Sequence, residues 1–194
     1  AFIDGRWVGF GSHLFNSKSA NPITHDLLTY DELKDWFAKE RDDLKVMMCI
    51  LDRLRRGELK TVIIYGLHYL DTPFQEMAMY GITETLKNIY KVPTICFCVN
   101  EVSFHLFKVI DPSESLIESF ESVPHILNIG HLPAQILHSL AKLSVCWVGE
   151  GANTFNESTR LGVPFFSLAS NEQTESRRLS PTKNDKHENL AIQL

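Results

Sequence analysis

The chain has 194 residues, of which 44% are hydrophobic and 22% charged, and its formal net charge is −5. This composition is that of a globular protein, and the length fits one domain. The weakly acidic balance excludes a broad basic surface, so we do not expect nucleic acid as a partner. No apolar run approaches the roughly 18–20 residues that span a bilayer, and no secretory signal opens the chain.

Residues 1–58 have a different pattern of apolar residues from the rest of the chain. The pattern Thr29-x-x-Glu32 is a capping box, and it opens one long helical repeat that we predict to end at Gly57. The cluster Arg53, Arg55 and Arg56 is typical of a solvated helix end. We expect residues 1–58 to be a linker and a long helix, which could end a preceding domain. Because the first residue is Ala1 and not Met, we expect a piece of a longer protein.

From residue 60 onward, apolar strands alternate with helices. Strands are predicted over residues 61–65, 93–99, 125–129, 144–148 and 164–168, and helices over 74–90, 113–120, 133–143, 154–161 and 185–194. Strands that are apolar throughout favour a parallel sheet buried on both sides. We therefore predict an α/β fold for residues 59–194, a Rossmann-like parallel sheet with helices on both faces. Such sheets bind ligands beyond the carboxyl ends of their strands.

The four cysteines all lie in apolar runs. Cys96 and Cys98 are two residues apart in a predicted strand, so their side chains share one face. No Cys-x-x-Cys spacing or histidine cluster accompanies them, so we favour buried reduced thiols over a metal or redox site.

One loop at a strand end has the composition of a phosphate site. Gly149 and Gly151 lie between a predicted strand and a predicted helix, where backbone can approach a ligand and free N–H groups face it. Thr154 and Glu157 have two interpretations that the residues leave open. They can form a second capping box, or Glu157 can accept hydrogen bonds from a sugar diol near the bound phosphates.

The stretch from Pro133 to Pro164 resembles the donor-binding segment of UDP-sugar glycosyltransferases of the two-domain GT-B class. The matching pieces are Pro133-Ala-Gln135, Leu137-His138, Gly151-Ala-Asn153-Thr154, Glu157 and Gly162-Val-Pro164. The resemblance implies that Gln135 lies near the base, Asn153 and Thr154 near the diphosphate, and Glu157 at the ribose hydroxyls. Gly149 stands where the family usually has a phosphate-contacting histidine, and Ala134 is inserted before Gln135. We expect His138 to support local packing.

Two further pieces extend the resemblance. Tyr65-Gly66 is similar to the turn that begins these domains, which places Gly66 near the donor. The family also has an acid–amide pair that reaches the donor sugar, and two candidates remain open: Glu172-Gln173, and Asp185 at the start of the residues 185–189. The second is similar to the ending of the soluble catalytic subunits of dolichol-linked N-acetylglucosaminyltransferases.

The resemblance implies that this chain binds the UDP part of a donor substrate, a nucleotide sugar, with no cofactor and no metal. The acceptor and the catalytic base would come from a second domain or subunit. The base is unknown, because His13, His25 and His68 are candidates by residue type alone. We expect a cytoplasmic protein, which a partner could hold at a membrane, and a chain that by itself binds a nucleotide without transferring a sugar.

Two other functions remain open at this point. A glycine-rich loop followed by Glu157 on one domain also resembles nucleotide N-glycosidases and nucleoside deoxyribosyltransferases, in which this glutamate would act on the ribose itself. The third interpretation is a non-catalytic subunit that binds a nucleotide sugar, because the usual histidine is missing at Gly149.

Overall fold

The computed structural model describes residues 2–3, 6–7, 26–66, 72–115, 120, 123–149 and 152–168. The predicted helix over residues 185–194 lies outside this part of the chain. Within it, β1 (Phe2–Ile3) and β2 (Arg6–Trp7) form an antiparallel pair. No helix of the described residues has the length and apolar character needed to cross a membrane.

The centre of the fold is a parallel sheet, as the apolar strands predicted. In the described residues it comprises β3 (Lys60–Tyr65), β4 (Thr94–Cys98), β5 (Lys108–Val109), β6 (His125–Asn128), β7 (Cys146–Gly149) and β8 (Phe165–Ser167). The strand order is β5-β6-β4-β3-β7-β8, with every pairing parallel. The five longer strands therefore follow the Rossmann order, in which the first strand lies in the middle. The short strand β5 was not predicted, because its two exposed residues carry no apolar run.

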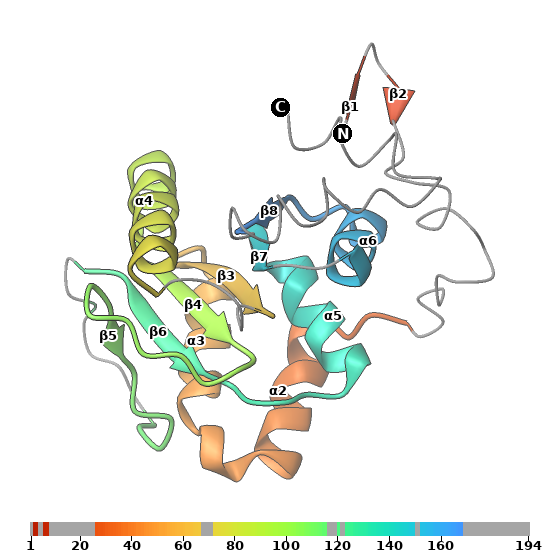
Figure 1. Cartoon of the computed structure of the whole chain (residues 1–194). Helices are drawn as coiled ribbons and strands as arrows, with labels where there is room; N and C mark the ends of the chain where they lie inside the picture. Colours follow the sequence, from red (N-terminus) through yellow and green to blue (C-terminus); the bar gives the residue numbers. More distant parts are fainter. Residues whose placement is uncertain are drawn as a thin grey trace.

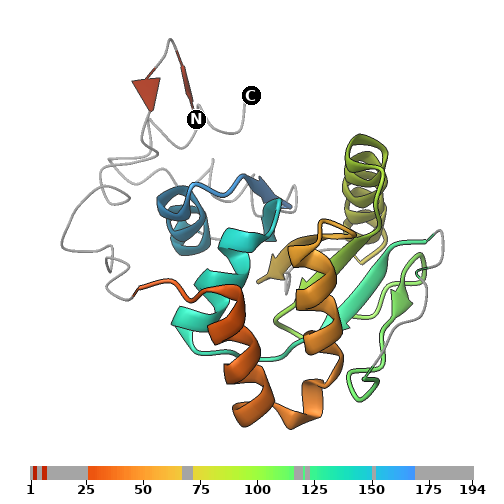
Figure 2. The same ribbon diagram turned by 180° about the vertical axis from the view of Figure 1, so that it is seen from behind.

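Helices cover both faces of this sheet, so the predicted α/β, Rossmann-like fold class is confirmed. Helix α4 (Thr72–Tyr90) follows β3 and lies on the face seen in Figure 1. The opposite face, turned to the viewer in Figure 2, carries α2 (Tyr30–Glu40), α3 (Val46–Arg55) and α5 (Ala134–Leu143). Helix α6 (Ala152–Leu161) packs beside α5. The two faces follow from right-handed crossovers, because the chain moves in opposite directions from β3 and from β7.

The single long helix predicted to end at Gly57 is wrong. The chain leaves the helix at Arg41, whose φ is −139° and ψ 60°, and the short 3₁₀ turn η1 (Asp42–Leu44) separates α2 from α3. A straight helix from Tyr30 to Arg56 would extend about 40 Å, about twice the length of the six-residue strand β3. The break lets both helices bury apolar side chains against the sheet, while the guanidinium of Arg41 donates to Asp43 and to the carbonyl of Ile129.

Both predicted ends of this helical region are confirmed. The Thr29 Oγ1 accepts from the backbone N–H of Glu32, and the Glu32 carboxylate accepts from the backbone N–H of Thr29 at 2.8 Å, which is a complete capping box. These hydrogen bonds hold the pKa of Glu32 below its ordinary value. Gly57 has a φ of +74°, a conformation that terminates helices and that glycine adopts without strain.

A second correction concerns the helix predicted from residue 113. The side chain of Asp111 accepts from the backbone N–H and from the hydroxyl of Ser113, at 2.8 and 2.7 Å. This local turn takes the place of a helical start, because a short carboxylate competes for the same backbone donors. Residues 116–119 of the predicted helix lie outside the described part of the chain.

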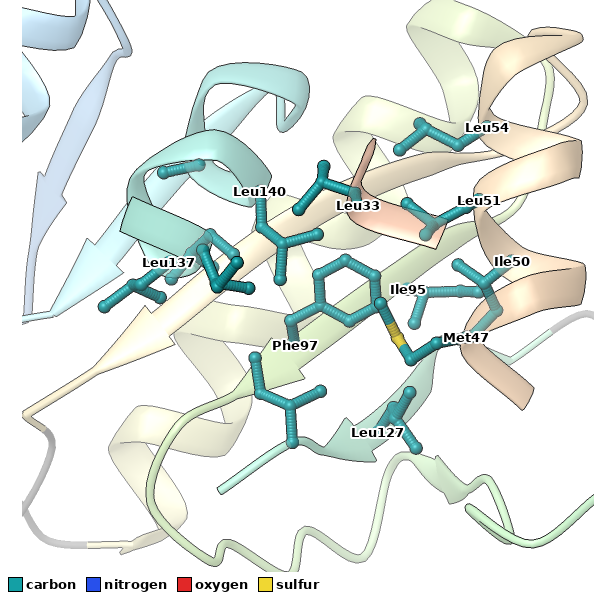
Figure 3. Packing of buried hydrophobic residues seen from close by; sticks show 14 of the residues in the cluster. Leu33, Met47, Ile50, Leu51, Leu54, Ile95, Phe97, Leu127, Leu137 and Leu140 are labelled. Atoms are coloured by element: carbon teal, nitrogen blue, oxygen red, sulfur yellow. The ribbon is translucent and has the colours of Figure 1, made fainter. Parts of the chain in front are cut away.

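The larger core lies between the sheet and the helix pair α2 and α3. Figure 3 shows the ring of Phe97 surrounded by side chains from the sheet and from α2, α3 and α5, among them Leu33, Met47, Leu51 and Leu140. Alternate residues of the same strands face α4 in a smaller core. The division of the chain after residue 58 stays a prediction, but α2 and α3 share one core with the sheet.

We predict that Phe97→Ala lowers the free energy of unfolding by about 3–5 kcal/mol, because a fully buried ring leaves a cavity that this core cannot fill. The matched control is Phe74→Ala on α4, where the ring is 74% exposed and the change should stay within about 0.5 kcal/mol. Urea unfolding followed by circular dichroism measures both. Equal losses in the two variants would contradict the placement of Phe97 at the centre of the core.

The cysteines are free thiols, as the sequence predicted. Cys96, Cys98 and Cys146 are buried in the smaller core. Burial raises the pKa of Cys146 to about 12 and raises that of Cys96 well above its ordinary value, since the apolar surroundings disfavour the thiolate. These thiols are therefore poor nucleophiles, and they contribute apolar packing.

The buried thiols should make the protein less stable in alkaline solution. Their stabilisation is complete below the unfolded pKa of 9.0 and is lost above it, because the unfolded chain releases protons that the folded chain retains. For each proton that the folded chain retains and the unfolded chain releases, the free energy of unfolding falls by about 1.4 kcal/mol per pH unit. Cys146→Ala should therefore lose less unfolding free energy than the wild type between pH of about 9 and about 10.5. Identical slopes in urea titrations would contradict this account.

Candidate functional site

The strand order creates a topological switch point at the carboxyl edge of the sheet. The chain leaves β3 for α4 on one face and leaves β7 for α6 on the other, and β3 and β7 are neighbours. In a doubly wound sheet this switch point is where ligands bind. Tyr65 of β3 is paired with Gly149 of β7, so the predicted site residues Gly66 and Gly149 lie side by side at this edge.

Gly149 is required by the sheet itself. A Cβ built at this position would collide with the carbonyl oxygen of Tyr65 on the neighbouring strand. The backbone therefore approaches the backbone of β3 here, which explains the glycine without a ligand. Gly66 follows β3 with a φ of +77°, a left-handed conformation that glycine adopts without strain.

Helix α6 begins at the carboxyl edge of the sheet, two residues earlier than predicted. Its first residue is Ala152, so Thr154 lies inside the first turn and is not the residue that precedes the helix. The predicted capping box of Thr154 and Glu157 is therefore wrong, since Ala152 and Asn153 already continue the helical backbone. The first turn contains no acidic residue. The start of any helix carries backbone N–H groups that have no intrahelical acceptor and the positive end of the helix dipole.

Glu157 projects from the second turn of α6 toward α5. Its Oε2 lies 3.5 Å from Nε2 of His138, and the Glu157 side chain is 39% exposed while that of His138 is 7% exposed. One turn further along, the ammonium of Lys142 on α5 donates to the carbonyl of Leu161 on α6 at 2.7 Å. Two contacts one turn apart on both helices mean that α5 and α6 run side by side in the same direction.

This register also brings the first turns of the two helices together. One turn before His138 and Glu157, the helix start that carries Gln135 lies beside the helix start that carries Asn153 and Thr154. Three of the predicted site positions, Gln135, Asn153 and Thr154, therefore meet at one end of the α5–α6 pair, and Glu157 lies one turn further along. Gly151 and the side chain of Asn153 lie outside the described residues, as do Glu172, Gln173, Asp185, His13, His25 and His68.

Gln135 already has a partner within the chain. Its Nε2 donates to the backbone carbonyl of Asp26 at 2.9 Å, and Ser139 on the same helix accepts from the backbone N–H of Leu28. The segment before α2 is thus tied to α5. The contact of Gln135 with a base, which the resemblance implied, stays a prediction.

The other charged candidates are engaged in structural contacts. Arg55 forms an ion pair with Asp31 at 2.7 Å, Arg56 pairs with Glu58, and Arg53 lies over the ring of Phe120. The basic cluster at the end of α3 therefore behaves as the solvated helix end that we predicted. Within the described residues, no three His, Cys, Asp or Glu side chains gather as metal ligands would.

Sequence reasoning missed the pairing of His138 with Glu157. A signal was present, because His138 and Lys142 on one helix have the same four-residue spacing as Glu157 and Leu161 on the next. Spacing within each helix could not reveal that these two pairs of residues face each other. Their contact depends on how the chain crosses from β6 to β7.

Comparison with known proteins adds no assignment. No protein-family model matches the chain, and no match is found among curated proteins or solved structures. A functional conclusion therefore has to be argued from the carboxyl edge and from the residues that α5 and α6 place there.

We predict that Gly149→Ala costs about 1–3 kcal/mol of unfolding free energy, because the added methyl group meets a strand backbone that cannot yield. Gly81→Ala is the matched control: this glycine lies in α4 with open space around it, so alanine should stabilise the helix by about 0.5–1 kcal/mol. Denaturant titration measures the expected loss of unfolding free energy in Gly149→Ala and the expected gain in Gly81→Ala. An unchanged free energy of unfolding in Gly149→Ala would show that β3 and β7 do not approach as described.

Proposed function

We propose that the chain binds the UDP part of a nucleotide sugar at the carboxyl edge between β3 and β7. In this proposal the diphosphate lies at the first turn of α6, and Glu157 accepts hydrogen bonds from the ribose hydroxyls. The observation that carries the proposal is a helix start at the switch point that has no acid in its first turn and a half-exposed carboxylate one turn further on. The resemblance around Gly151, Asn153 and Gly162 supports the same chemistry.

The charges along α6 fit a diphosphate joined to a diol. Anions are stabilised at a helix start by free N–H groups and by the helix dipole. Glu157 lies five residues after Ala152, about 7.5 Å along the helix axis, so its charge is kept away from the phosphate oxygens. An ionised carboxylate only accepts hydrogen bonds, so it suits neutral hydroxyl donors such as those of ribose.

The proposed role in transfer is limited to the donor. Loss of the sugar leaves negative charge on UDP, and helix N–H groups aimed at that charge would stabilise it. The acceptor hydroxyl needs a base, and we propose that a second domain or subunit supplies it. The chain is then the donor-binding part of a larger two-domain transferase.

Calorimetric titration of the full chain with UDP and UDP-sugars tests the proposal. The wild type should bind them, and Glu157→Gln should weaken binding by about 10-fold or more, because a hydrogen bond to a charged acceptor is lost. Glu84→Gln is the matched control, since Glu84 is also partly exposed, also has a side-chain nitrogen at 3.5 Å (that of Lys87), and lies on α4. This control should bind UDP as the wild type does.

Two outcomes would contradict the proposal, and two others would assign the chain a different function. Absence of UDP binding by the wild type would do so, and so would equal weakening by Glu157→Gln and Glu84→Gln. Release of free base from a nucleoside monophosphate, detected by chromatography, would instead favour the single-domain nucleotide N-glycosidase or deoxyribosyltransferase. UDP binding without transfer, even when the second domain or subunit and an acceptor are supplied, would assign the chain to a non-catalytic subunit.

A further inference from the structure

We propose that His138 is a positioning residue: it holds one oxygen of Glu157 so that the other selects ribonucleotides over deoxyribonucleotides. This inference rests on the proposed function, because it concerns how Glu157 meets the sugar of the bound nucleotide. The starting observation is the 3.5 Å distance between Nε2 of His138 and Oε2 of Glu157.

The imidazole of His138 has little freedom to turn. Its side chain is 7% exposed, and its ring lies 6.4 Å from the ring of Trp147, at an angle of 59° between the planes. Trp147 is itself buried in β7. A ring packed against a sheet residue on one side presents Nε2 toward α6 in a fixed direction, which is what a positioning group needs.

The carboxylate of Glu157 would be poorly oriented without such a contact. A glutamate on a helix surface samples several rotamers, and ordering it costs conformational entropy. An N–H of His138 that donates to Oε2 restricts these rotamers and leaves Oε1 as an acceptor for a hydroxyl. Hydrogen bonds of this kind are often long in the absence of ligand and shorten in the complex.

Further contacts between α5, α6 and the sheet hold His138 and Glu157 opposite each other. Lys142 on α5 donates to the carbonyl of Leu161 on α6, one turn beyond the His138 and Glu157 contact. Phe155 of α6 also packs edge to face on Phe165 of β8, with ring centroids 5.7 Å apart. These contacts hold α6 against α5 and the sheet independently of residue 138, so substitutions there test the orientation of Glu157 and leave the helix in place.

The test compares two amides at position 138. Glutamine can place its amide N–H near the position of Nε2, whereas the shorter asparagine places it near Nδ1 and falls short of Glu157. Calorimetry with UDP and with 2′-deoxy-UDP gives a preference for each variant of the full chain. We expect a wild-type preference for UDP of about 10-fold, retained by His138→Gln and reduced to less than about 2-fold by His138→Asn.

A double-substitution cycle separates positioning from general structure. In the Glu157→Gln background, changing His138 to Asn should cause no further loss of preference, because the residue acts through Glu157. Thermal unfolding should show similar stability for His138→Gln and His138→Asn, since both place a neutral amide in the same buried position.

The inference is overturned if His138→Asn weakens UDP and 2′-deoxy-UDP equally, or if its effects add to those of Glu157→Gln. It is also overturned if both amide variants keep the wild-type preference. These results leave the proposed function standing, because the wild type still binds UDP. A wild type that binds neither nucleotide overturns the proposed function and this inference together. If His138→Asn does not fold while His138→Gln does, the residue has a structural role and the inference fails.

Discussion

The parallel pairing of β3 with β7 is the constraint on which the rest of the fold depends. It places the first long strand in the middle of the sheet, so that the chain turns in opposite directions from these two neighbouring strands. One face of the sheet then receives α4, and the other receives α5 and α6. The close approach of Gly149 to the carbonyl of Tyr65 shows how tightly this pairing is made, since any larger residue would separate the strand ends.

The same pairing determines where chemistry can occur. Because β7 ends at the carboxyl edge beside β3, the helix that follows β7 begins at this edge. Helix α5 follows β6 and begins at the same edge, and the contacts of His138 with Glu157 and of Lys142 with Leu161 align the two helices side by side. A partly exposed acid is thereby held in the second turn of α6, beyond the positive helix end, and this combination carries the proposed function.

Much of this fold was predictable from residue patterns. The apolar runs in β3, β4 and β7 indicated buried parallel strands, and the Thr29–Glu32 box gave the start of α2, since both signals are local. The break at Arg41 was not predictable, because the residue carries no helix-breaking signal and departs from the helix only to meet Asp43 and Ile129. Long-range partners of this kind are absent from local spacing.

In the candidate site, too, the features set by local patterns were predictable and those set by long-range contacts were not. The glycine-rich junction was found at the correct edge, but Gly149 proved to serve the pairing of two strands. The start of α6 was misplaced by two residues, because Thr154 has the residue type of a helix cap and nothing in the pattern shows that Ala152 already begins the helix. The partner of Glu157 depended on how α5 crosses from β6 to β7, which only the assembled sheet determines.

The most direct measurement is an amide NMR titration of the full chain with UDP, which locates a bound nucleotide residue by residue. The account predicts that the largest shifts fall on the first turn of α6, on Gly66 and Gly149 at the strand ends, and on Glu157. The residues of α4 around Glu84 should remain unchanged. Shifts confined to regions away from the carboxyl edge of β3 and β7, or no shifts at saturating UDP, would contradict the central claim.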